Sequence, residues 1–486
     1  MYLGIDIGTS SVKAVLVEAS GATVAQSGAP LEVSRPRPEY SEQEPEAWWR
    51  SIVRAAAELP RDARAAVRAV GLSGQMHGAT LLDAQDRPLR PAILWNDGRS
   101  ALQCVDLEQR APDSRAITGN IMMPGFTAPK LLWVARHEPE VFRSTASVLL
   151  PKDYVRLRMT GEKVSDMSDA AGTGWLDVGA RDWSDAMLAA TDLTRRHMPR
   201  LVEGSHPSGT LTARAAQQLG VPRVMVAGGA GDNAASAVGV GVVAPGQAFL
   251  SLGTSGVLFV VTDRFRPNAE AAAHAFCHCL PGRWHRMSVM LSAASVLDWV
   301  AQLVGESDLA HLVATAQARG VSRQSPFVLP YLTGERTPHN DPHARGVFFG
   351  IRPDSTAADL AVAALEGVAF GFADGLEVLL AGGGAIDEIS VTGGGSRLPY
   401  WGELLAAALG RSLTYRRNSD VGAALGAARL ARLALGDERV EEVCVAPPIE
   451  RVVRPDPDVA ALLAVRRRTF IRLYQDLKDT FLEYPP

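Results

Sequence analysis

Two short segments of this chain, about 245 residues apart, repeat one pattern of an apolar run, a Gly-Thr-Ser turn and a second apolar run. The first segment is residues 5–12 and the second is residues 250–257. A tight turn between two β-prone runs is typical of an antiparallel hairpin. Two such hairpins at half-chain spacing in 486 residues predict two similar halves. We place the boundary near residues 241–246, which divides the chain into predicted domains 1–244 and 245–486.

Strand and helix signals alternate along the rest of the chain. Residues 23–31 predict a third strand after the first hairpin, residues 44–58 have helical periodicity, and residues 67–72 form another apolar run. Such alternation favours an α/β fold. Residues 456–482 predict a long, solvated amphipathic helix that is rich in arginine.

Composition excludes several classes of protein. The net charge is −4 with no basic block, which argues against a nucleic-acid-binding surface. No apolar run reaches about 18 residues, so we expect no transmembrane helix and no membrane partner. The N-terminus lacks the basic start of a signal peptide, and the 4 cysteines do not form a disulfide framework. The spacing of Cys277 and Cys279 is too tight for a structural metal site. We therefore expect a reduced, cytoplasmic enzyme.

The two Gly-Thr-Ser turns are candidate phosphate sites, because each presents consecutive backbone N–H groups and two hydroxyls. The candidate phosphate contacts are Gly8, Thr9, Ser10, Gly253, Thr254 and Ser255. The copies differ where Asp6 of the first corresponds to Ser251 of the second. A carboxylate repels phosphate unless a cation lies between them, so Asp6 is suited to hold hydrated Mg²⁺. Two ordinary hairpins are the alternative interpretation.

A glycine-rich turn carries a second carboxylate. Residues 224–227 are apolar, glycines follow, and Asp232 lies at the start of an alanine-rich helix. An N-cap would explain this position, but the glycines favour close approach by a ligand. The carboxylate could accept the proton of a substrate hydroxyl that attacks a phosphoryl group. It must be ionised to do so, and we expect the helix dipole to favour the ionised form.

Residues 389–396 form a third strand–glycine–helix unit. Glycines before a helix can accommodate the sugar and phosphates of a nucleotide, although a tight helix–strand turn is the alternative. The candidate nucleotide contacts are Gly393, Gly394, Gly395 and Ser396. The chain has no Walker A motif, so backbone N–H groups and Mg²⁺ would replace a P-loop lysine. Of the few lysines, Lys13 and Lys130 are the candidates for a functional role.

Two further loops, residues 71–78 and residues 93–99, have the side chains that a sugar requires. A polyol needs neutral and charged hydrogen-bond partners together with an aromatic face. The candidate sugar contacts are Gln75, His77, Trp95, Asn96 and Asp97. A single histidine such as His77 is also a common structural residue.

Two longer motifs identify a family. Residues 125–134 (GFTAPKLLWV) fit its first signature, and residues 346–366 fit its second. The chain resembles the FGGY family of carbohydrate kinases over essentially its full length. Within that family, four segments resemble the members that phosphorylate D-xylulose. These segments are residues 73–83, 91–99, 118–127 and 329–340.

The resemblance implies an α/β, actin-like fold in which a catalytic cleft separates two ribonuclease-H-like domains. It implies transfer of the γ-phosphoryl group of ATP to the terminal hydroxyl of D-xylulose, with Mg²⁺ present. Asp232 resembles the catalytic base, Asp6 resembles the carboxylate that positions Mg²⁺ through bound water, and Met76 and His77 match the substrate loop. The expectation is that sugar binds mainly to domain 1–244 and ATP mainly to domain 245–486.

Two alternatives stay open. A sister kinase would act on ribulose, gluconate or glycerol, whereas the Gln-Met-His-Gly stretch of residues 75–78 resembles the D-xylulose group. An actin-like protein that is not a kinase, such as a chaperone-type ATPase or a sugar-sensing regulator, would need a peptide-binding extension or a helix-turn-helix, and we expect neither. The oligomeric state is open, with a homodimer as the candidate.

Overall fold

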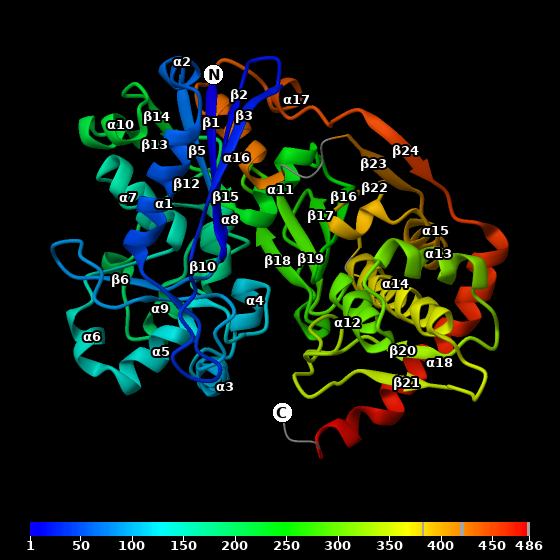
Figure 1. Ribbon diagram of the computed structural model, residues 1–486. Helices are drawn as coiled ribbons and strands as arrows, with labels where there is room; N and C mark the ends of the chain where they lie inside the picture. Colours follow the sequence, from blue (N-terminus) through cyan, green and yellow to red (C-terminus); the bar gives the residue numbers. More distant parts are fainter. Residues whose placement is uncertain (382, 418–421, 484–486) are drawn as a thin grey trace.

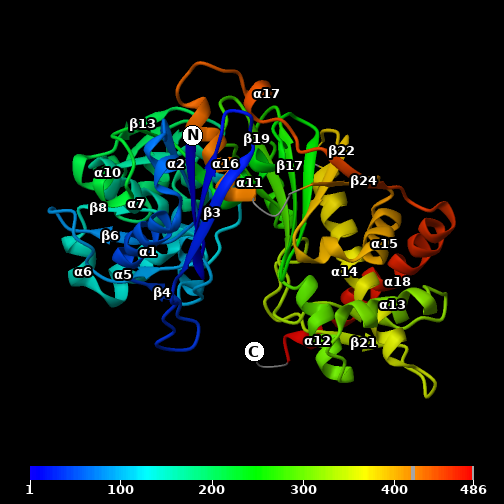
Figure 2. The same cartoon turned by 45° about the horizontal axis from the view of Figure 1, so that its top comes forward.

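The computed structural model describes residues 1–381, 383–417 and 422–483 (Figure 1). Each half of the chain contributes one seven-stranded sheet, and helices pack on both sheets. The predicted α/β class and the two similar halves are therefore confirmed. Figure 2 shows the halves side by side.

The N-terminal sheet contains the predicted meander. Its strands, in spatial order, are β13 (Pro207–Thr210), β14 (Met225–Ala227), β5 (Ala69–Gly74), β1 (Tyr2–Ile7), β2 (Ser11–Val17) and β3 (Thr23–Pro30), and β15 (Ala230–Gly231) also pairs with β5. β1, β2 and β3 are antiparallel neighbours. On the other side β1 runs parallel to β5, and β5 runs parallel to β14. β13 closes this edge in the antiparallel direction.

The C-terminal sheet repeats the six-strand path from β3 to β13, and β18 extends it at one edge, whereas β15 is the seventh strand of the N-terminal sheet. Its strands, in spatial order, are β18 (His274–Cys277), β19 (Trp284–Met290), β17 (Gly256–Thr262), β16 (Gln247–Leu252), β22 (Glu388–Thr392), β23 (Leu413–Arg416) and β24 (Ile449–Val453). The meander is β16, β17 and β19, the parallel pair is β22 and β23, and β24 is antiparallel. Equal topology in two sheets is what a duplicated chain predicts.

The strand register supports the comparison of Asp6 with Ser251. Asp6 on β1 lies opposite Lys13 on one side and Ser73 on the other. Ser251 on β16 lies opposite Val257 and Thr392. The two residues therefore occupy the same place in their sheets, at the end of the central strand where the phosphate turn begins.

Helices and short ribbons fill the remaining chain. The helices of the first half are α1 (Pro45–Glu58), α2 (Arg61–Ala65), α3 (Ala101–Arg110), α4 (Ser114–Thr118), α5 (Thr127–His137), α6 (Pro139–Ser144), α7 (Pro151–Thr160), α8 (Met167–Ala170), α9 (Asp185–Ala189), α10 (Ala213–Leu219) and α11 (Asp232–Val240). Those of the second half are α12 (Ala294–Val304), α13 (Leu309–Arg319), α14 (Ala357–Ala381), α15 (Pro399–Leu409), α16 (Gly422–Leu433), α17 (Val440–Val443) and α18 (Pro457–Phe481). The 3₁₀ turns are η1 (Ala171–Thr173), η2 (Arg195–His197), η3 (Ala269–Ala271) and η4 (Gly394–Arg397). The two-stranded ribbons are β4 (Glu42–Gln43) with β7 (Ala92–Ile93), β6 (Thr80–Leu82) with β8 (Ser147–Leu149), β9 (Val164–Asp166) with β12 (Arg200–Val202), β10 (Leu176–Asp177) with β11 (Asp182–Trp183), and β20 (Phe327–Leu329) with β21 (Val347–Phe349).

Helices α11 and α16 join the two halves. Each follows a parallel strand of its own sheet, and the two pack against each other (Figure 2). Their backbones are very close, because a Cβ on Gly426 would lie 1.8 Å from the carbonyl oxygen of Ala235. α16 also packs against β1 and β5, so a helix from the second half covers the N-terminal sheet. Only small residues allow this approach, which explains why both helices are rich in glycine and alanine.

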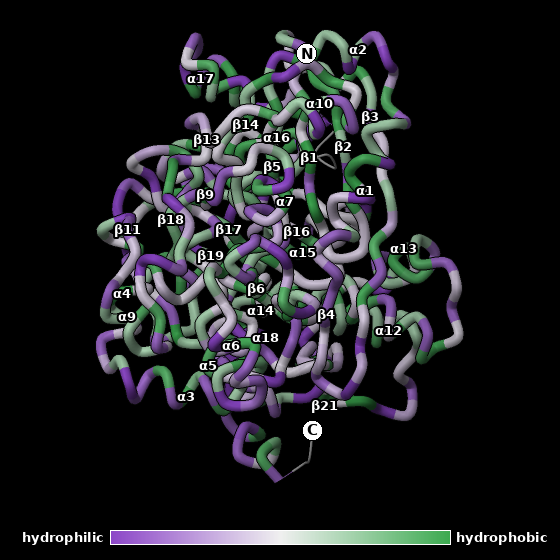
Figure 3. The backbone as a smooth tube through the Cα atoms, turned by 90° about the vertical axis from the view of Figure 1, so that its left-hand side faces the viewer, coloured by the Kyte–Doolittle hydropathy of each residue, from purple (hydrophilic) through white to green (hydrophobic). Residues whose placement is uncertain are grey.

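The apolar core is divided between the sheets and the space between them. One buried cluster surrounds the C-terminal sheet, a second surrounds the N-terminal sheet, and a third contains residues from both halves. Apolar segments run through the interior strands in Figure 3, and hydrophilic segments are frequent on the outer loops. Among the described residues, none of the helices has the length and apolar character of a membrane span.

The long C-terminal helix is present as predicted, and one of its arginines is buried. α18 begins after the N-cap Asp456, whose side chain accepts two backbone N–H bonds. Its Arg466 guanidinium pairs with Glu366 of α14 at 2.5 and 2.6 Å, and both side chains are almost fully buried. The prediction of a solvated helix therefore holds for one face only, since the other face attaches to the C-terminal core.

Candidate active site

A cavity of about 430 Å³ contains both predicted catalytic carboxylates. Its lining residues come from both halves: Asp6, Lys13, Asp232, Asn233, Ser236, Val240, Phe249, Thr392, Gly393, Gly394, Gly422, Ala423 and Ala424. β1, β2 and α11 form one wall, and the end of β22 with its glycine turn forms another. The cavity therefore brings the first carboxylate, the second carboxylate and part of the third glycine loop together.

Asp6 faces this cavity from the end of β1. The Ser73 hydroxyl donates a hydrogen bond of 2.9 Å to Asp6 Oδ1, and Lys13 lies opposite on β2. Burial raises the pKa of Asp6, while the Ser73 hydrogen bond and the Lys13 charge act to lower it. A nearby cation would stabilise the ionised form of a carboxylate in this setting, because burial makes an uncompensated negative charge unfavourable.

Asp232 is the first residue of α11. The backbone N–H and the Nδ2 of Asn233 donate to Asp232 Oδ1 at 2.7 and 3.0 Å. Burial, together with the charge of Asp6, raises the pKa of Asp232 to about 7, even though the Asn233 hydrogen bonds act to lower it. Desolvation and the neighbouring carboxylate therefore disfavour the ionised form, which opposes the expected effect of the helix dipole.

Met76 lies against Gly231, the residue before Asp232, and His77 lies against Gly172. A Cβ on Gly231 would be 2.9 Å from the Met76 sulfur, and one on Gly172 would be 2.6 Å from His77 Nδ1. His77 Nδ1 lies 2.6 Å from the carbonyl oxygen of Gly172, so this nitrogen carries the proton and Nε2 is left as an acceptor. Burial lowers the pKa of His77 to about 3, which keeps the ring neutral.

Lys130 supports the histidine rather than contacting the cavity. Its Nζ donates to the carbonyl oxygens of His77 at 2.9 Å and of Gly125 at 2.6 Å. The Thr127 hydroxyl donates to the same His77 carbonyl. Because His77 has a positive φ of 68°, these bonds hold a backbone conformation that side-chain-bearing residues rarely adopt.

Gln75 and Trp95 attach to the first phosphate turn. The Thr9 hydroxyl donates to Gln75 Oε1 at 3.2 Å and accepts from Trp95 Nε1 at 2.9 Å. Gln75 Nε2 also donates to Gln43 Oε1. Trp95 is 41% exposed, so part of this residue is accessible to a ligand. Within the same turn the N–H of Gly8 donates to the carbonyl oxygen of Ser11, while Ser10 is exposed.

Both carboxylate oxygens of Asp97 accept hydrogen bonds from other parts of the protein. It accepts from the Ser41 backbone N–H at 2.7 Å and from the Arg99 guanidinium at 2.7 and 2.8 Å. The residue is buried, so its present role is to fix the loop. Asp97, Asn96 and Trp95 line a second cavity of about 920 Å³. Direct sugar contact by these three residues stays a prediction.

The second phosphate turn is open at its tip. Thr254 and Ser255 are exposed, and the carbonyl oxygens of Gly253 and Thr254 accept N–H bonds from the start of α12. In the third loop, a Cβ on Gly393 would lie 2.7 Å from the Leu252 backbone, and one on Gly395 would meet the Leu252 side chain at 2.6 Å. Gly394 has open space around it. The Ser396 hydroxyl donates to the Gly393 carbonyl at 2.6 Å, so it closes the turn.

Four contributors were missed by sequence reasoning. Ser73 and Asn233 bond to the two carboxylates, and Ser236 and the start of α16 line the cavity. Asn233 could have been found from its place after Asp232. Ser73 and α16 are brought to the site by strand pairing and helix packing, which no local pattern indicates.

The comparisons with known proteins identify the family. The profile of the N-terminal domain of the FGGY family of carbohydrate kinases matches residues 1–239, and that of the C-terminal domain matches residues 248–435. A xylulose kinase of Escherichia coli K12 is 56% identical over 479 residues, with 98% of this chain and 99% of that protein covered. The chain belongs to the FGGY family of carbohydrate kinases.

Solved structures extend the result. A xylulose kinase structure from Brucella ovis is 47% identical with a TM-score of 0.95, and 99% of each chain is covered. A gluconate kinase structure from Lactobacillus acidophilus has a TM-score of 0.94 at 24% identity over 99% of each chain, which shows the fold alone. The expected actin-like fold of two related domains is therefore confirmed. This FGGY member is a sugar kinase, and ATP is its phosphoryl donor.

Proposed function

We propose that this FGGY kinase transfers the γ-phosphoryl group of ATP to the terminal hydroxyl of D-xylulose and releases D-xylulose 5-phosphate. The observation that carries the proposal is the pair Asp6 and Asp232 in one cavity between the halves. The substrate follows from the relatives, since the Escherichia coli protein that is 56% identical is a xylulose kinase. Sugar would bind mainly to residues 1–244, and ATP mainly to residues 245–486.

Asp232 would act as the general base. A carboxylate with a pKa of about 7 is half ionised near neutral pH, and a base works best when its pKa lies near the operating pH. Asp232 would accept the proton of the sugar hydroxyl as that oxygen forms its bond to the γ-phosphorus of ATP. The bond from the γ-phosphorus to the bridging oxygen then breaks, and ADP leaves. Neutral His77, through Nε2, would accept a hydrogen bond from another sugar hydroxyl.

The residues present fit a Mg²⁺ ion. Neither Asp6 nor Asp232 has a salt bridge among the described residues, and burial raises both pKa values. No group of three or more ligating side chains occurs in the described part of the chain. Mg²⁺ keeps several waters and uses one or two carboxylates plus substrate phosphates, so Asp6 would hold it through bound water. When bound, the ion neutralises charge on the transferring phosphoryl group.

The backbone turns would hold the rest of ATP. Thr254 and Ser255 are exposed at the end of the central strand, and Gly394 leaves open space beside the cavity. Gly8, Thr9 and Ser10 would approach the γ-phosphoryl group from the other half. Closure of the halves would bring these turns together and expel water, which competes with the sugar as a nucleophile.

The test of substrate is an ADP-release assay over pentuloses, polyols and sugar acids, with and without Mg²⁺. We expect D-xylulose to give the largest kcat/KM and omission of Mg²⁺ to remove turnover. Clear activity on ribulose, gluconate or glycerol without activity on D-xylulose would overturn the substrate and keep the enzyme class. ATP hydrolysis that no sugar accelerates would favour an actin-like ATPase.

The test of the base is Asp232→Ala. Loss of a general base costs about 10²- to 10⁴-fold in turnover, so we expect kcat to fall by at least about 100-fold. Calorimetry should find the ATP affinity nearly unchanged. A variant with near-normal kcat would contradict the assignment.

We also propose a cytoplasmic homodimer. All four cysteines are free and buried, as expected for a protein that folds in a reducing compartment. Light scattering at two protein concentrations would measure the mass, and a mass of one chain at both would contradict the dimer. Fractionation of the producing cell would test the compartment.

A further inference from the structure

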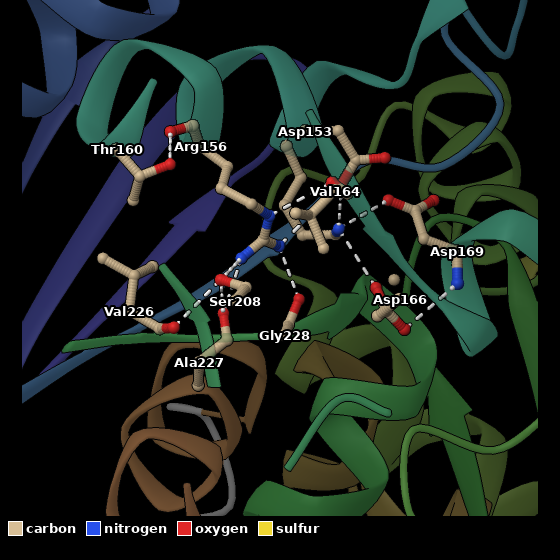
Figure 4. A network of polar contacts seen from close by, with 12 residues as sticks. Asp153, Arg156, Thr160, Val164, Asp166, Asp169, Ser208, Val226, Ala227 and Gly228 are labelled. Carbon is tan, nitrogen blue, oxygen red and sulfur yellow. Dashed lines mark hydrogen bonds and ion pairs between the residues drawn. The ribbon is translucent and has the colours of Figure 1, made fainter. Parts of the chain in front are cut away.

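A buried cluster of charged residues lies behind the segment that carries Asp232. α7 contributes Lys152, Asp153 and Arg156, and the end of β9 with α8 contributes Asp166 and Asp169. All five side chains are fully buried. Lys152 Nζ lies 2.5 Å from Asp153 Oδ1, 3.0 Å from Asp166 Oδ1 and 3.4 Å from Asp169 Oδ2. Figure 4 shows Asp153, Arg156, Asp166 and Asp169 gathered in this cluster.

Arg156 attaches this cluster to the strand end before Asp232. Its guanidinium donates to the carbonyl oxygens of Ala227 and Gly228, each at 2.5 Å (Figure 4). It also donates to the Ser208 hydroxyl, which in turn donates to the carbonyls of Val226 and Ala227. Several bonds from buried groups therefore converge on residues 226–228.

Ser168 attaches the cluster at the other end of the same segment. The Gly231 N–H donates to Ser168 Oγ at 3.1 Å. The Ser168 hydroxyl donates to Asp166 Oδ2 at 2.5 Å, and Asp166 Oδ1 is paired with Lys152. A chain of three contacts thus runs from Lys152 to the backbone N–H of Gly231, the residue before Asp232.

The backbone before Asp232 contains three glycines, so side chains from other segments are needed to restrict its conformation. Gly228, Gly229 and Gly231 have no side chains to pack, and glycine has the largest backbone freedom of any residue. A shift of about 1 Å at a reacting group can cost about 100-fold in rate. Burying five ionisable groups is costly, and apolar residues often serve stability equally well, so stability alone does not explain this cluster.

The charges of the cluster also bear on Asp232. Two cations face three carboxylates, and burial raises the pKa of Asp169 well above its usual value, which disfavours its ionised form. The charge of Asp232 contributes to that rise, which shows that the two carboxyls are close enough to interact.

We propose that Ser168 and Arg156, held by the Lys152 cluster, are positioning residues that fix the backbone of residues 227–231 and thereby the carboxylate of Asp232. This inference rests on the proposed function, because it takes Asp232 to be the base. Neither residue contacts the cavity, so both act through the backbone.

The test compares Ser168→Ala with Ser165→Ala. Both serines are fully buried and three residues apart, but the Ser165 hydroxyl has no hydrogen-bond partner in the described chain. For Ser168→Ala we expect kcat to fall about 10- to 100-fold, with both KM values within about threefold of wild type. Ser168→Thr retains the hydroxyl and should recover most of kcat. Ser165→Ala should match wild type.

A second readout does not require a substrate. Hydrogen exchange of the unliganded protein should show faster exchange in residues 225–233 of Ser168→Ala and no change there in Ser165→Ala. Unchanged kcat, or unchanged exchange in this segment, would overturn the proposal. If Ser168→Ala does not fold, Ser168→Cys, with a weaker donor of similar size, replaces it with the same two criteria. A wild-type enzyme inactive on every sugar would end the proposed function, and the exchange result would still decide the positioning role.

Discussion

The carboxyl of Asp232 is the group on which the proposed chemistry depends most directly. Burial and Asp6 raise its pKa to about 7, and the two Asn233 donors limit the rise. The sequence indicated the residue and its helix position, but its pKa depends on Asp6, which lies more than two hundred residues earlier. A local motif can reveal which residue is present, whereas the pKa of that residue also depends on charged groups that folding brings near it from distant segments.

The pH dependence of turnover follows from this value. Asp232 must be ionised to accept a proton, so activity is present above its pKa and is lost as the pH falls through it. We expect kcat/KM for the sugar, which reports the free enzyme, to have an acidic limb near pH 7 and to fall about tenfold per unit below pH 6.

Asn233→Ala provides the matched variant for this profile. Removal of Nδ2 takes away a donor that stabilises the ionised carboxylate, so the limb should move to higher pH. A limb near pH 4 in the wild type, or a limb that moves down in Asn233→Ala, would contradict this account of Asp232.

Helix α16 is the element that most clearly ties the two halves together. It comes from the second half, yet it packs on β1, β5 and α11 of the first. A Cβ on Gly71 would lie 1.8 Å from the carbonyl oxygen of Ala427, and one on Gly4 would lie 2.0 Å from that of Ala424. The sequence predicted the strands that carry these glycines, but not the helix that requires them.

Gly71→Ala should therefore be strongly destabilising. A methyl group cannot fit 1.8 Å from a backbone oxygen, so α16 must move away from the sheet. We expect a loss of at least about 3 kcal/mol, which lowers Tm by about 3 °C or more in calorimetry. Gly98→Ala is the control, because its new Cβ would meet Glu39 at an ordinary 3.4 Å. Equal Tm values for the two variants would show that the close packing is not required.

At the scale of the whole molecule, the candidate site belongs to neither half alone. Asp6 and Asp232 come from the first half, and Gly393 and Gly394 come from the second. Ligands that contact both walls favour the arrangement in which the walls are closest. The FGGY fold thus allows sugar and nucleotide binding to be coupled through closure.

Closure can be measured by small-angle X-ray scattering. A nonhydrolysable ATP analogue and D-xylulose together should reduce the radius of gyration more than either alone, because only the pair bridges both walls. Asp232→Asn should show the same decrease, since it alters the base rather than the binding surfaces. An unchanged radius with both ligands bound, as verified by calorimetry, would contradict closure.

The sequence by itself determined the duplicated hairpins, the α/β class, the family, and the candidate residues at strand ends and helix starts. These features can be recognised from short-range periodicity, turn residues and motifs, all of which are local patterns in the sequence. Only the tertiary structure decided that Arg99 donates hydrogen bonds to the Asp97 carboxylate and that Lys130 donates to the backbone carbonyl of His77. It also decided that Lys152 belongs to a buried charged cluster behind Asp232. Those outcomes depend on which residues, distant in sequence, folding brings together in the interior, where water is excluded. The role of a buried polar group follows from its hydrogen-bond partners there, and its neighbours in the sequence do not reveal them.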